Sequence, residues 1–175
     1  GLIRILFEPS FSVNFWNLNT DINGSSVGPN NNPFGNHIPR DFFVDINMRK
    51  AFFYAFNFDQ FLNETLGNAQ FNVTFGVKFG GAIPSGMIGY EDLSSALVFD
   101  MARARAFYNR TQWVRDRGWA GSGFTLAINV GAGDAVDTAA AAAWAQNLEG
   151  LAPGIAITVV PVPDFWSITI PHDNP

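Results

Sequence analysis

The stretch at residues 123–162 reads GFTLAINVGAGDAVDTAAAAAWAQNLEGLAPGIAITVVPV. An apolar segment up to Val130 is followed by a glycine turn, a long alanine run and, from Ile155, a second apolar segment. The two apolar segments are typical of strands buried in a parallel sheet, and the alanine run is typical of a helix. Strand, helix and strand in this order predict a βαβ unit with a right-handed crossover, and therefore an α/β fold.

The turn of this unit, Gly131-Ala-Gly133, leads directly into Asp134. Either Asp134 or Asp137 is expected to cap the helix, which the pattern extends through Leu148. Because ligands of open α/β sheets bind beyond the carboxyl ends of the strands, Gly133 and Asp134 are candidate ligand-binding residues. A helix N-terminus can hold an anion, but the Asp134 carboxylate would repel a phosphate, so we interpret the turn as a capped connection.

Aromatic side chains dominate a second informative stretch at residues 45–67. Asp45 is placed to cap one helix and Asn57 to cap the next, and Phe56 and Phe61 have the spacing of a hydrophobic staple. Gly67 is suited to the left-handed position that ends a helix. The stretch therefore predicts two consecutive helices joined by a corner.

The remaining segments are shorter. Alternating apolar residues predict a strand at residues 2–7 and a strand or extended arm at residues 71–79. Asp100 is predicted to cap a third helix that ends at Gly118. Residues 17–40 are rich in Asn, Gly, Ser and Pro, and this composition predicts a long surface loop.

Composition limits the function classes. The chain has a net charge of −5 and no basic run, so nucleic-acid binding is not expected, because phosphate neutralisation needs clustered Lys and Arg. It contains no cysteine, which excludes thiolate catalysis, disulfides and cysteine-ligated metals. His37 and His172 fall in separate predicted loops, and we expect neither a metal centre nor a cofactor. The 18 phenylalanines are interpreted as a Phe-rich core together with an interface, and an aromatic stacking site is the alternative.

Three segments carry a family resemblance that covers residues 41–166. They are Asp45-x-x-x-Arg49-x-Ala51-x-x-Tyr54-Ala55-x-Asn57-x-Asp59, Ile83-Pro84-Ser-Gly86-x-x-Gly89-Tyr90, and the stretch from the Asp100 helix through Gly118-Trp119 to Gly154-Ile155. In this order and spacing they resemble the extracytoplasmic solute-binding proteins of oligopeptide and dipeptide ABC importers. Residues 71–79 depart from the family pattern as an insertion before the Pro84 loop.

The resemblance implies that residues 1–175 form a single lobe of a periplasmic-binding-protein type II fold, an α/β lobe with a mixed sheet and flanking helices. Such proteins trap a ligand between two hinged lobes, so the second lobe of the same protein is expected to be missing here. The strand-like start at residues 2–7 and the unfinished end at residues 171–175 also favour a fragment. The implied partner is a membrane permease. The implied location is extracytoplasmic, in the periplasm or at the cell surface, with the full-length lipoprotein anchored to the membrane.

The resemblance also implies ligand-binding residues. A ligand-proximal aromatic is expected near Trp166, beside Phe165, just after the last predicted strand. Tyr90 is a further candidate, although its loop alternatively braces the hinge. Arg49 is interpreted as a structural ion-pair partner or cap.

These features lead us to expect non-catalytic capture of oligopeptides or similar solutes. Oligosaccharides are an alternative ligand, because sugar faces pack on Trp and Tyr side chains. A cell-surface structural module and a secreted hydrolase are alternatives of other classes. Against a hydrolase, Ser85 and Ser122 lack a nucleophile-elbow context, and the adjacent Glu91 and Asp92 are interpreted as a solvated turn.

Two further patterns concern the location of the chain. No apolar run approaches the roughly 20 residues that span a bilayer. Asn-x-Ser/Thr sequons agree with an extracellular setting, and they occur at Asn23, Asn63, Asn72 and Asn109.

Overall fold

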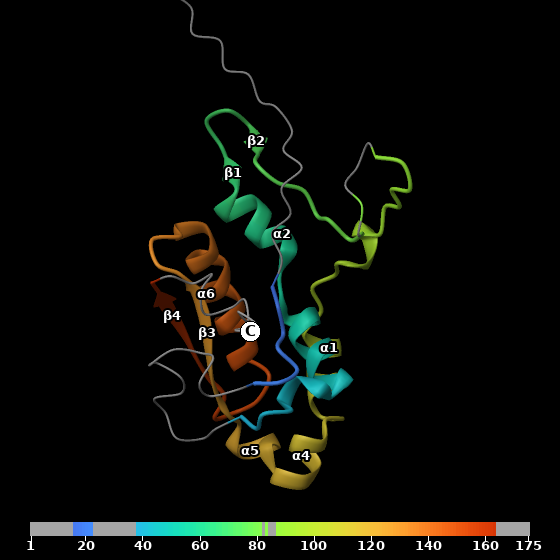
Figure 1. The fold of residues 1–175 in the computed structure, drawn as a ribbon, viewed down its shortest axis with the longest axis vertical. Coiled ribbons are helices and arrows are strands. Elements are labelled where there is room, and N and C mark those ends of the chain that lie inside the picture. The colour runs from blue at the N-terminus through green and yellow to red at the C-terminus, as the bar shows by residue number, and fades with distance from the viewer. Residues whose placement is uncertain (1–15, 23–37, 82, 84–86, 164–175) are drawn as a thin grey trace, which may run out of the picture.

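The computed structural model of the protein describes residues 16–22, 38–81, 83 and 87–163. Within these ranges the architecture is mixed α/β, with two small sheets and flanking helices (Figure 1). The N-terminal elements are the 3-10 helix η1 (Phe42–Val44), α1 (Ile46–Ala55), α2 (Phe58–Gln60) with its π-helical continuation η2 (Phe61–Thr65), β1 (Gly67–Asn68) and β2 (Val73–Thr74). The C-terminal elements are the 3-10 helix η3 (Ser94–Ala96), α3 (Met101–Tyr108), α4 (Gln112–Arg117), α5 (Trp119–Ser122), β3 (Thr125–Gly131), α6 (Ala135–Glu149) and β4 (Ala156–Val162).

Some sequence predictions fall outside the described residues. They concern the strand at residues 2–7, the centre of the loop at residues 17–40, and His37, His172, Phe165 and Trp166. Among the helices of the described ranges, none has the length and apolar character that a bilayer crossing requires.

The βαβ unit predicted at residues 123–162 is present. β3 and β4 pair in parallel, with Thr125 opposite Ala156 at one end and Gly131 opposite Val162 at the other. α6 connects the two strands and packs against both of them, as Figure 1 shows. The register places the carboxyl ends of both strands next to the start of α6.

The helix caps predicted from single acidic or amide residues are confirmed. Each side chain accepts a hydrogen bond from a backbone N–H two or three residues later, and this interaction satisfies a free donor at the helix start. The pairs are Asp45 with Asn47 at 2.8 Å, Asn57 with Gln60 at 3.1 Å, Asp100 with Arg103 at 2.9 Å, and Asp134 with Asp137 at 2.9 Å. The predicted staple is present too, with ring centroids 5.9 Å apart, between Phe56 and Phe61.

An aromatic cluster forms the core between the βαβ unit and the N-terminal helices. Phe42, Phe52 and Phe124 are at most 1% exposed. The Phe124 ring lies 5.0 Å from the Phe42 ring and 6.3 Å from the Phe52 ring, measured between centroids. Edge-to-face and offset ring pairs of this kind stabilise a core beyond the area they bury. For the described residues, the interpretation of the phenylalanines as mainly core is therefore confirmed.

Two buried rings with polar atoms connect this core to distant backbone. Trp144 Nε1 donates to the Phe52 carbonyl at 3.0 Å, which fixes α6 against α1. The Tyr108 hydroxyl donates to the Trp119 carbonyl at 2.8 Å, which fixes α3 against α5. Burial raises the pKa of Tyr108 to about 12, so the hydroxyl is protonated and able to donate at neutral pH.

Asp45 connects two helices that are distant in sequence. One carboxylate oxygen caps α1, and the other accepts a hydrogen bond from the Gln112 N–H, at the start of α4, at 2.9 Å. The positive ends of two helix dipoles therefore share one carboxylate. Arg49 donates to the Phe43 carbonyl at 2.6 Å, and this contact agrees with its interpretation as a structural cap.

The predicted left-handed conformation of Gly67 is wrong. The second helix ends in the π-helical turn η2, where the Leu66 N–H donates to the Phe61 carbonyl at 3.3 Å. Gly67 lies outside the left-handed region and begins β1. A Cβ at this position would lie 2.1 Å from the Asn63 carbonyl oxygen. Glycine is required by the close approach of the backbone and not by a positive φ.

The third helix is shorter than predicted. α3 ends at Tyr108, and α4 starts separately, because the buried Thr111 hydroxyl accepts a hydrogen bond from the Val114 N–H at 3.3 Å. This side chain caps a new helix inside a stretch whose apolar spacing suggests a continuous one. Gly118 adopts φ 67° and ends α4, as predicted.

The alternation at residues 71–79 predicts more strand than is present. Only β2 forms, and it pairs antiparallel with β1, with Gly67 opposite Thr74. A two-stranded hairpin has no face to bury by itself. Phe71 and Phe75 are accordingly exposed.

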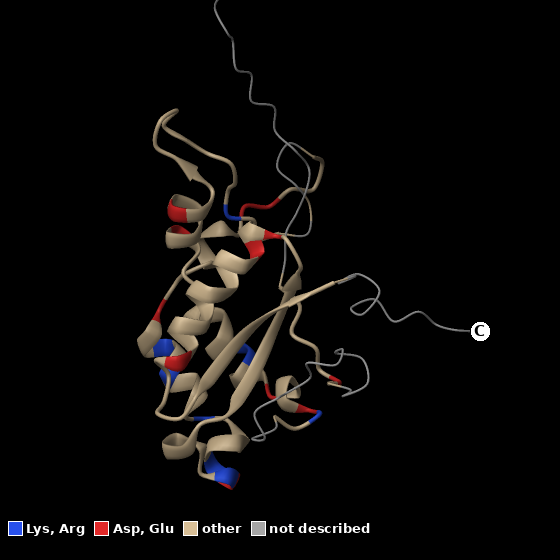
Figure 2. Ribbon diagram, turned by 90° about the vertical axis from the view of Figure 1, so that its left-hand side faces the viewer, with Lys and Arg blue, Asp and Glu red and all other residues tan. Residues whose placement is uncertain are grey.

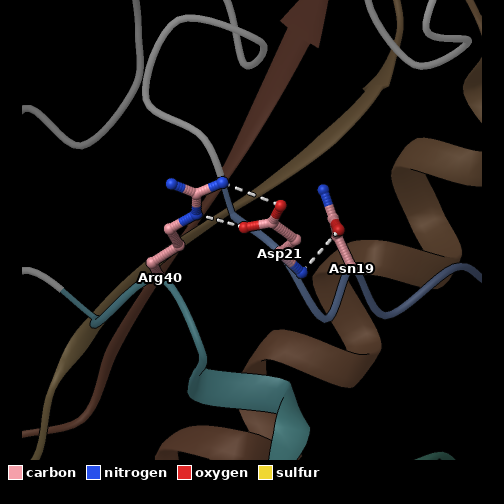
Figure 3. Close-up of polar contacts among 3 residues, drawn as sticks. All are labelled: Asn19, Asp21 and Arg40. Carbon is pink, nitrogen blue, oxygen red and sulfur yellow. Dashed lines mark hydrogen bonds and ion pairs between the residues drawn. The ribbon is translucent and has the colours of Figure 1, made fainter.

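The two described ends of the loop at residues 17–40 meet at its base (Figure 3). Arg40 and Asp21 form an ion pair, with Nη2 2.9 Å from Oδ2, and the Ile22 N–H donates to the Arg40 carbonyl at 2.8 Å. Asn19 Oδ1 accepts from the Asp21 N–H at 2.9 Å. The hydrogen bond from Arg40 holds the pKa of Asp21 below its usual value, and the same contact raises the pKa of Arg40.

Gly123 and Gly154 pack backbone against backbone just before the two strands. Both have positive φ, 60° and 78°. A Cβ on Gly123 would lie 2.2 Å from the Gly154 carbonyl carbon, and a Cβ on Gly154 would lie 2.3 Å from the Ser122 carbonyl oxygen. The parallel pair therefore begins at a contact that only two glycines can form.

Alanine at position 123 is expected to destabilise the protein strongly. Gly123→Ala should lower the free energy of unfolding by about 3 kcal/mol, because backbone strain adds to overpacking. Gly133→Ala is the matched control, since Gly133 has φ 86° but no atom within 4 Å of its Cβ position, and its cost should be about 1 kcal/mol. Urea unfolding measures both values, and equal costs would contradict the proposed contact.

The shared carboxylate of Asp45 is expected to contribute more than an ordinary cap. Asp45→Ala should cost about 2 kcal/mol, because it leaves two helix starts without their acceptor, whereas Asp134→Ala, which removes one cap, should cost about 1 kcal/mol. Thermal or urea unfolding of the two variants measures the difference. A cost for Asp45→Ala that does not exceed the cost for Asp134→Ala would argue against a shared acceptor.

Candidate functional site

An open depression of about 410 Å³ lies at the carboxyl edge of the β3–β4 pair. One side is the first half of α6 and the other is Pro161 of β4. The lining residues are Gly133, Asp134, Ala135, Thr138, Ala139, Ala142 and Pro161.

The strands and the turn determine where this depression forms. The Ala132 N–H donates to the Val162 carbonyl at 3.1 Å, which extends the parallel register into the turn, and the Asp134 N–H donates to the Gly131 carbonyl at 3.1 Å. α6 therefore starts directly above the end of β4. Because alternate residues of a strand face the same side, Pro161 faces α6 together with Val159.

Small side chains keep the depression open. Ala135, Ala139 and Ala142 lie on one stripe of α6, at spacings of three and four residues. Larger residues of the same helix, Trp144 and Leu148, are buried in the core. The helix thus has a small-residue surface near its start and a bulky packing surface near its end.

The electrostatics of the depression disfavour anions. The Asp134 carboxylate accepts from the Asp137 N–H at 2.9 Å, and the Thr138 hydroxyl donates to the Asp134 carbonyl at 2.6 Å. Burial, together with the negative charge of Asp134, raises the pKa of Asp137. One carboxylate at the N-cap and one in the first turn of α6 offset the attraction that a helix N-terminus has for a negative group. The turn is therefore a capped connection, in agreement with its interpretation from sequence.

The predicted site residues are only partly brought together. Gly133 and Asp134 line the depression. Tyr90 does not line it: the residue is 40% exposed elsewhere on the surface, and its N–H donates to the Met87 carbonyl at 3.2 Å. Trp166 and Phe165 follow β4 but lie outside the described residues.

Pro161 and the alanine stripe of α6 were not among the residues predicted from sequence. The stripe has a readable signal, since positions 135, 138, 139 and 142 repeat at helical spacing. A proline inside an apolar strand is also informative, because proline is confined to edge positions in a sheet. Its place opposite Val130 follows from the strand register, which the sequence does not specify.

Asp92, another polar residue singled out in the sequence, has a local structural role. Asp92 accepts a hydrogen bond from the Ser94 N–H at 2.9 Å, and its hydrogen bonds with Ser94 lower the pKa of Asp92. This is the turn that the pair Glu91 and Asp92 suggests. Among the described residues, no group of three or more His, Asp or Glu side chains is arranged to hold a metal ion.

Comparison with known protein families, with curated proteins and with solved structures gives no match for this chain.

The raised pKa of Asp137 has a measurable consequence for stability. The folded state holds the proton more tightly than the unfolded chain, so this group lowers the free energy of unfolding as pH rises from 3.8 through the folded pKa. Asp137→Asn should remove that fall and make the protein more stable at neutral pH. Asp134→Asn should only reduce it, because burial of Asp137 remains. Urea unfolding between pH 3.5 and 7 measures the slopes, at about 25 °C. An unchanged slope in Asp137→Asn would contradict the assignment.

Proposed function

We propose that this chain is one lobe of an extracytoplasmic receptor that captures oligopeptides or similar solutes and delivers them to the membrane permease of an ABC importer. The observation that supports the proposal is the open depression at the carboxyl edge of β3 and β4. Small-molecule sites bury most of the ligand surface, and a depression that is open on one side cannot do so alone. A second, hinged lobe of the same protein would supply the opposing wall.

The chemistry of the depression fits the main chain of a peptide. The first amides of α6 are not used by intrahelical hydrogen bonds, and Ala135, which lines the depression, offers one of them to a peptide carbonyl. Asp134 offers a negative charge for a peptide N–H or terminal ammonium, and Ala139 and Pro161 offer apolar contact. Contacts of this kind bind the backbone without selecting a particular sequence.

The positions of the aromatic residues favour peptides over oligosaccharides. Sugar faces pack on exposed aromatic rings, but most of the described rings are in the core or packed against it. Of the large aromatic side chains that the described ranges leave exposed, Phe71, Phe75 and Tyr90, none lines the depression. An oligosaccharide ligand therefore has less support than a peptide.

Binding should stabilise the full-length protein, in which both lobes are present. Short peptides at about 100 times their dissociation constant should add about 2.7 kcal/mol to the free energy of unfolding, and a thermal-shift assay detects this as a higher Tm. Ala139→Leu, which fills the depression, should weaken peptide binding at least about tenfold, which corresponds to about 1.4 kcal/mol. Ala106→Leu is the matched control, since Ala106 is exposed on α3 and does not line the depression.

Each rival function predicts a different outcome, in the same thermal-shift assay or, for a hydrolase, in a turnover assay. Stabilisation by cello-oligosaccharides and not by peptides would replace the peptide with a sugar. A protein that no solute stabilises would be a structural module. A substrate turnover that one Asp, Glu, Ser or His substitution abolishes would identify a hydrolase.

A further inference from the structure

We propose that Asn72 carries an N-linked glycan on the tip of the β1–β2 hairpin. The proposal rests on the extracytoplasmic location that belongs to the proposed function, because such glycans are found on secreted and surface proteins. Asn63, Asn72 and Asn109 are the sequon residues within the described ranges, and all three are exposed. Exposure therefore does not distinguish the three sites. The structure around each sequon determines which one a transferase can reach.

The sequon at Asn109 is closed in the folded protein. Its Thr111 is fully buried, and the Thr111 hydroxyl donates to the Tyr108 carbonyl at 2.7 Å and accepts from the Val114 N–H at 3.3 Å. A sequon is read through both its asparagine and the hydroxyl two residues later. A transferase could reach this hydroxyl only after the end of α3 and the start of α4 had unfolded.

The sequon at Asn63 is fixed in a helix. Asn63 and Thr65 both belong to the π-helical turn η2, and the Asn63 carbonyl is in close contact with the backbone at Gly67. The intervening Glu64 accepts a hydrogen bond from Gln60 Nε2 at 2.9 Å. An extended conformation of this sequon would require η2, the turn that precedes β1, to unfold.

The sequon at Asn72 is open. Asn72 lies in the turn between β1 and β2 with φ 50°, and Thr74 is an exposed residue of a short extended strand. The turn is closed by its other residues, since the Phe71 N–H donates to Asn68 Oδ1 at 3.2 Å. Within the described part of the chain, neither the side-chain amide of Asn72 nor the hydroxyl of Thr74 forms a hydrogen bond. The β1–β2 hairpin projects from the rest of the fold, as Figure 1 shows. Both groups that a transferase must reach belong to this hairpin.

The surface of the hairpin provides a second, independent reason. Residues 65–77 contain no Asp, Glu, Lys or Arg, and Figure 2 accordingly shows the hairpin in tan, without blue or red. Phe71, Phe75 and Val77 are 44%, 57% and 82% exposed. Proteins usually protect short exposed strands with charged side chains, because uncharged apolar edges associate with other chains. A glycan at Asn72 would supply this protection by covering the apolar tip with a bulky, hydrated group.

The transfer is a simple substitution. Asn72 Nδ2 attacks the anomeric carbon of an oligosaccharide that is carried on a lipid phosphate. The bond between nitrogen and carbon forms, the bond between that carbon and the phosphate oxygen breaks, and the lipid phosphate leaves with the electron pair. Nδ2 loses one proton to the medium. The lipid-linked oligosaccharide is the only co-reactant, and no redox partner is needed.

Peptide mapping of the protein purified from its native host tests the proposal. Cleavage after Glu64 and Lys78 releases residues 65–78, which contain Asn72 and neither of the other two described sequons. The peptide should carry a glycan mass, and enzymatic release should convert the asparagine to aspartate. Thr74→Ala should abolish the modification, whereas Thr74→Ser and Asn109→Gln should retain it.

An unmodified 65–78 peptide, or a glycan on Asn109 with Asn72 bare, would overturn the assignment. Stabilisation by peptides, measured on the same preparation, separates this result from the proposed function. A bare Asn72 in a protein that peptides stabilise overturns the glycan alone. A glycan at Asn72 in a protein that peptides do not stabilise overturns the binding function alone.

Discussion

The position of Phe124, immediately before β3, is the constraint on which the rest of the structure depends. A pair of parallel strands has too little surface to form a core, and the inward residues of α6 include several alanines that fill little volume. Phe124 fills this space by packing against Phe42 and Phe52, and it thereby brings η1 and α1 against the βαβ unit. The aromatic N-terminal helices are the second wall of one core and not a separate module.

The same arrangement explains why the candidate site lies where it does. Bulky rings gather at the end of the sheet where β3 begins, and in α6 the large residues Trp144 and Leu148 lie in its second half. At the other end, Ala139 and Ala142 leave the surface between α6 and Pro161 unfilled. The C-terminal half of α6 therefore packs in the core, and its N-terminal half lines the depression. Removing volume near Trp144 would damage the fold, whereas adding volume near Ala139 would damage the site.

Sequence predicts the features of this protein that depend on neighbouring residues. The caps at Asp45 and Asp134 involve groups two or three positions apart, so their patterns are visible in the chain itself. Gly67 is different, because its small size is required by the Asn63 carbonyl in a π-helical turn, which a 3.6-residue periodicity does not anticipate. The candidate site was likewise predictable only where it depends on neighbouring residues. Gly133 and Asp134 follow from the rule for strand ends, while Pro161 joins them through a register that only the folded pair defines.

The use of aromatic residues in the core also determines which chemical groups the depression can offer to the proposed ligand. With the described rings elsewhere, the groups available for the proposed binding are amides at the start of α6, the Asp134 carboxylate and the methyl groups of alanines. Each of these contributes modestly, and association must first offset the loss of translational and rotational freedom. Useful affinity therefore requires contacts from a second surface, which the opposing lobe of the proposed receptor would provide. If the proposed function holds, such a receptor would select for a peptide backbone and not for particular side chains, because the groups that it offers recognise features that all peptides share.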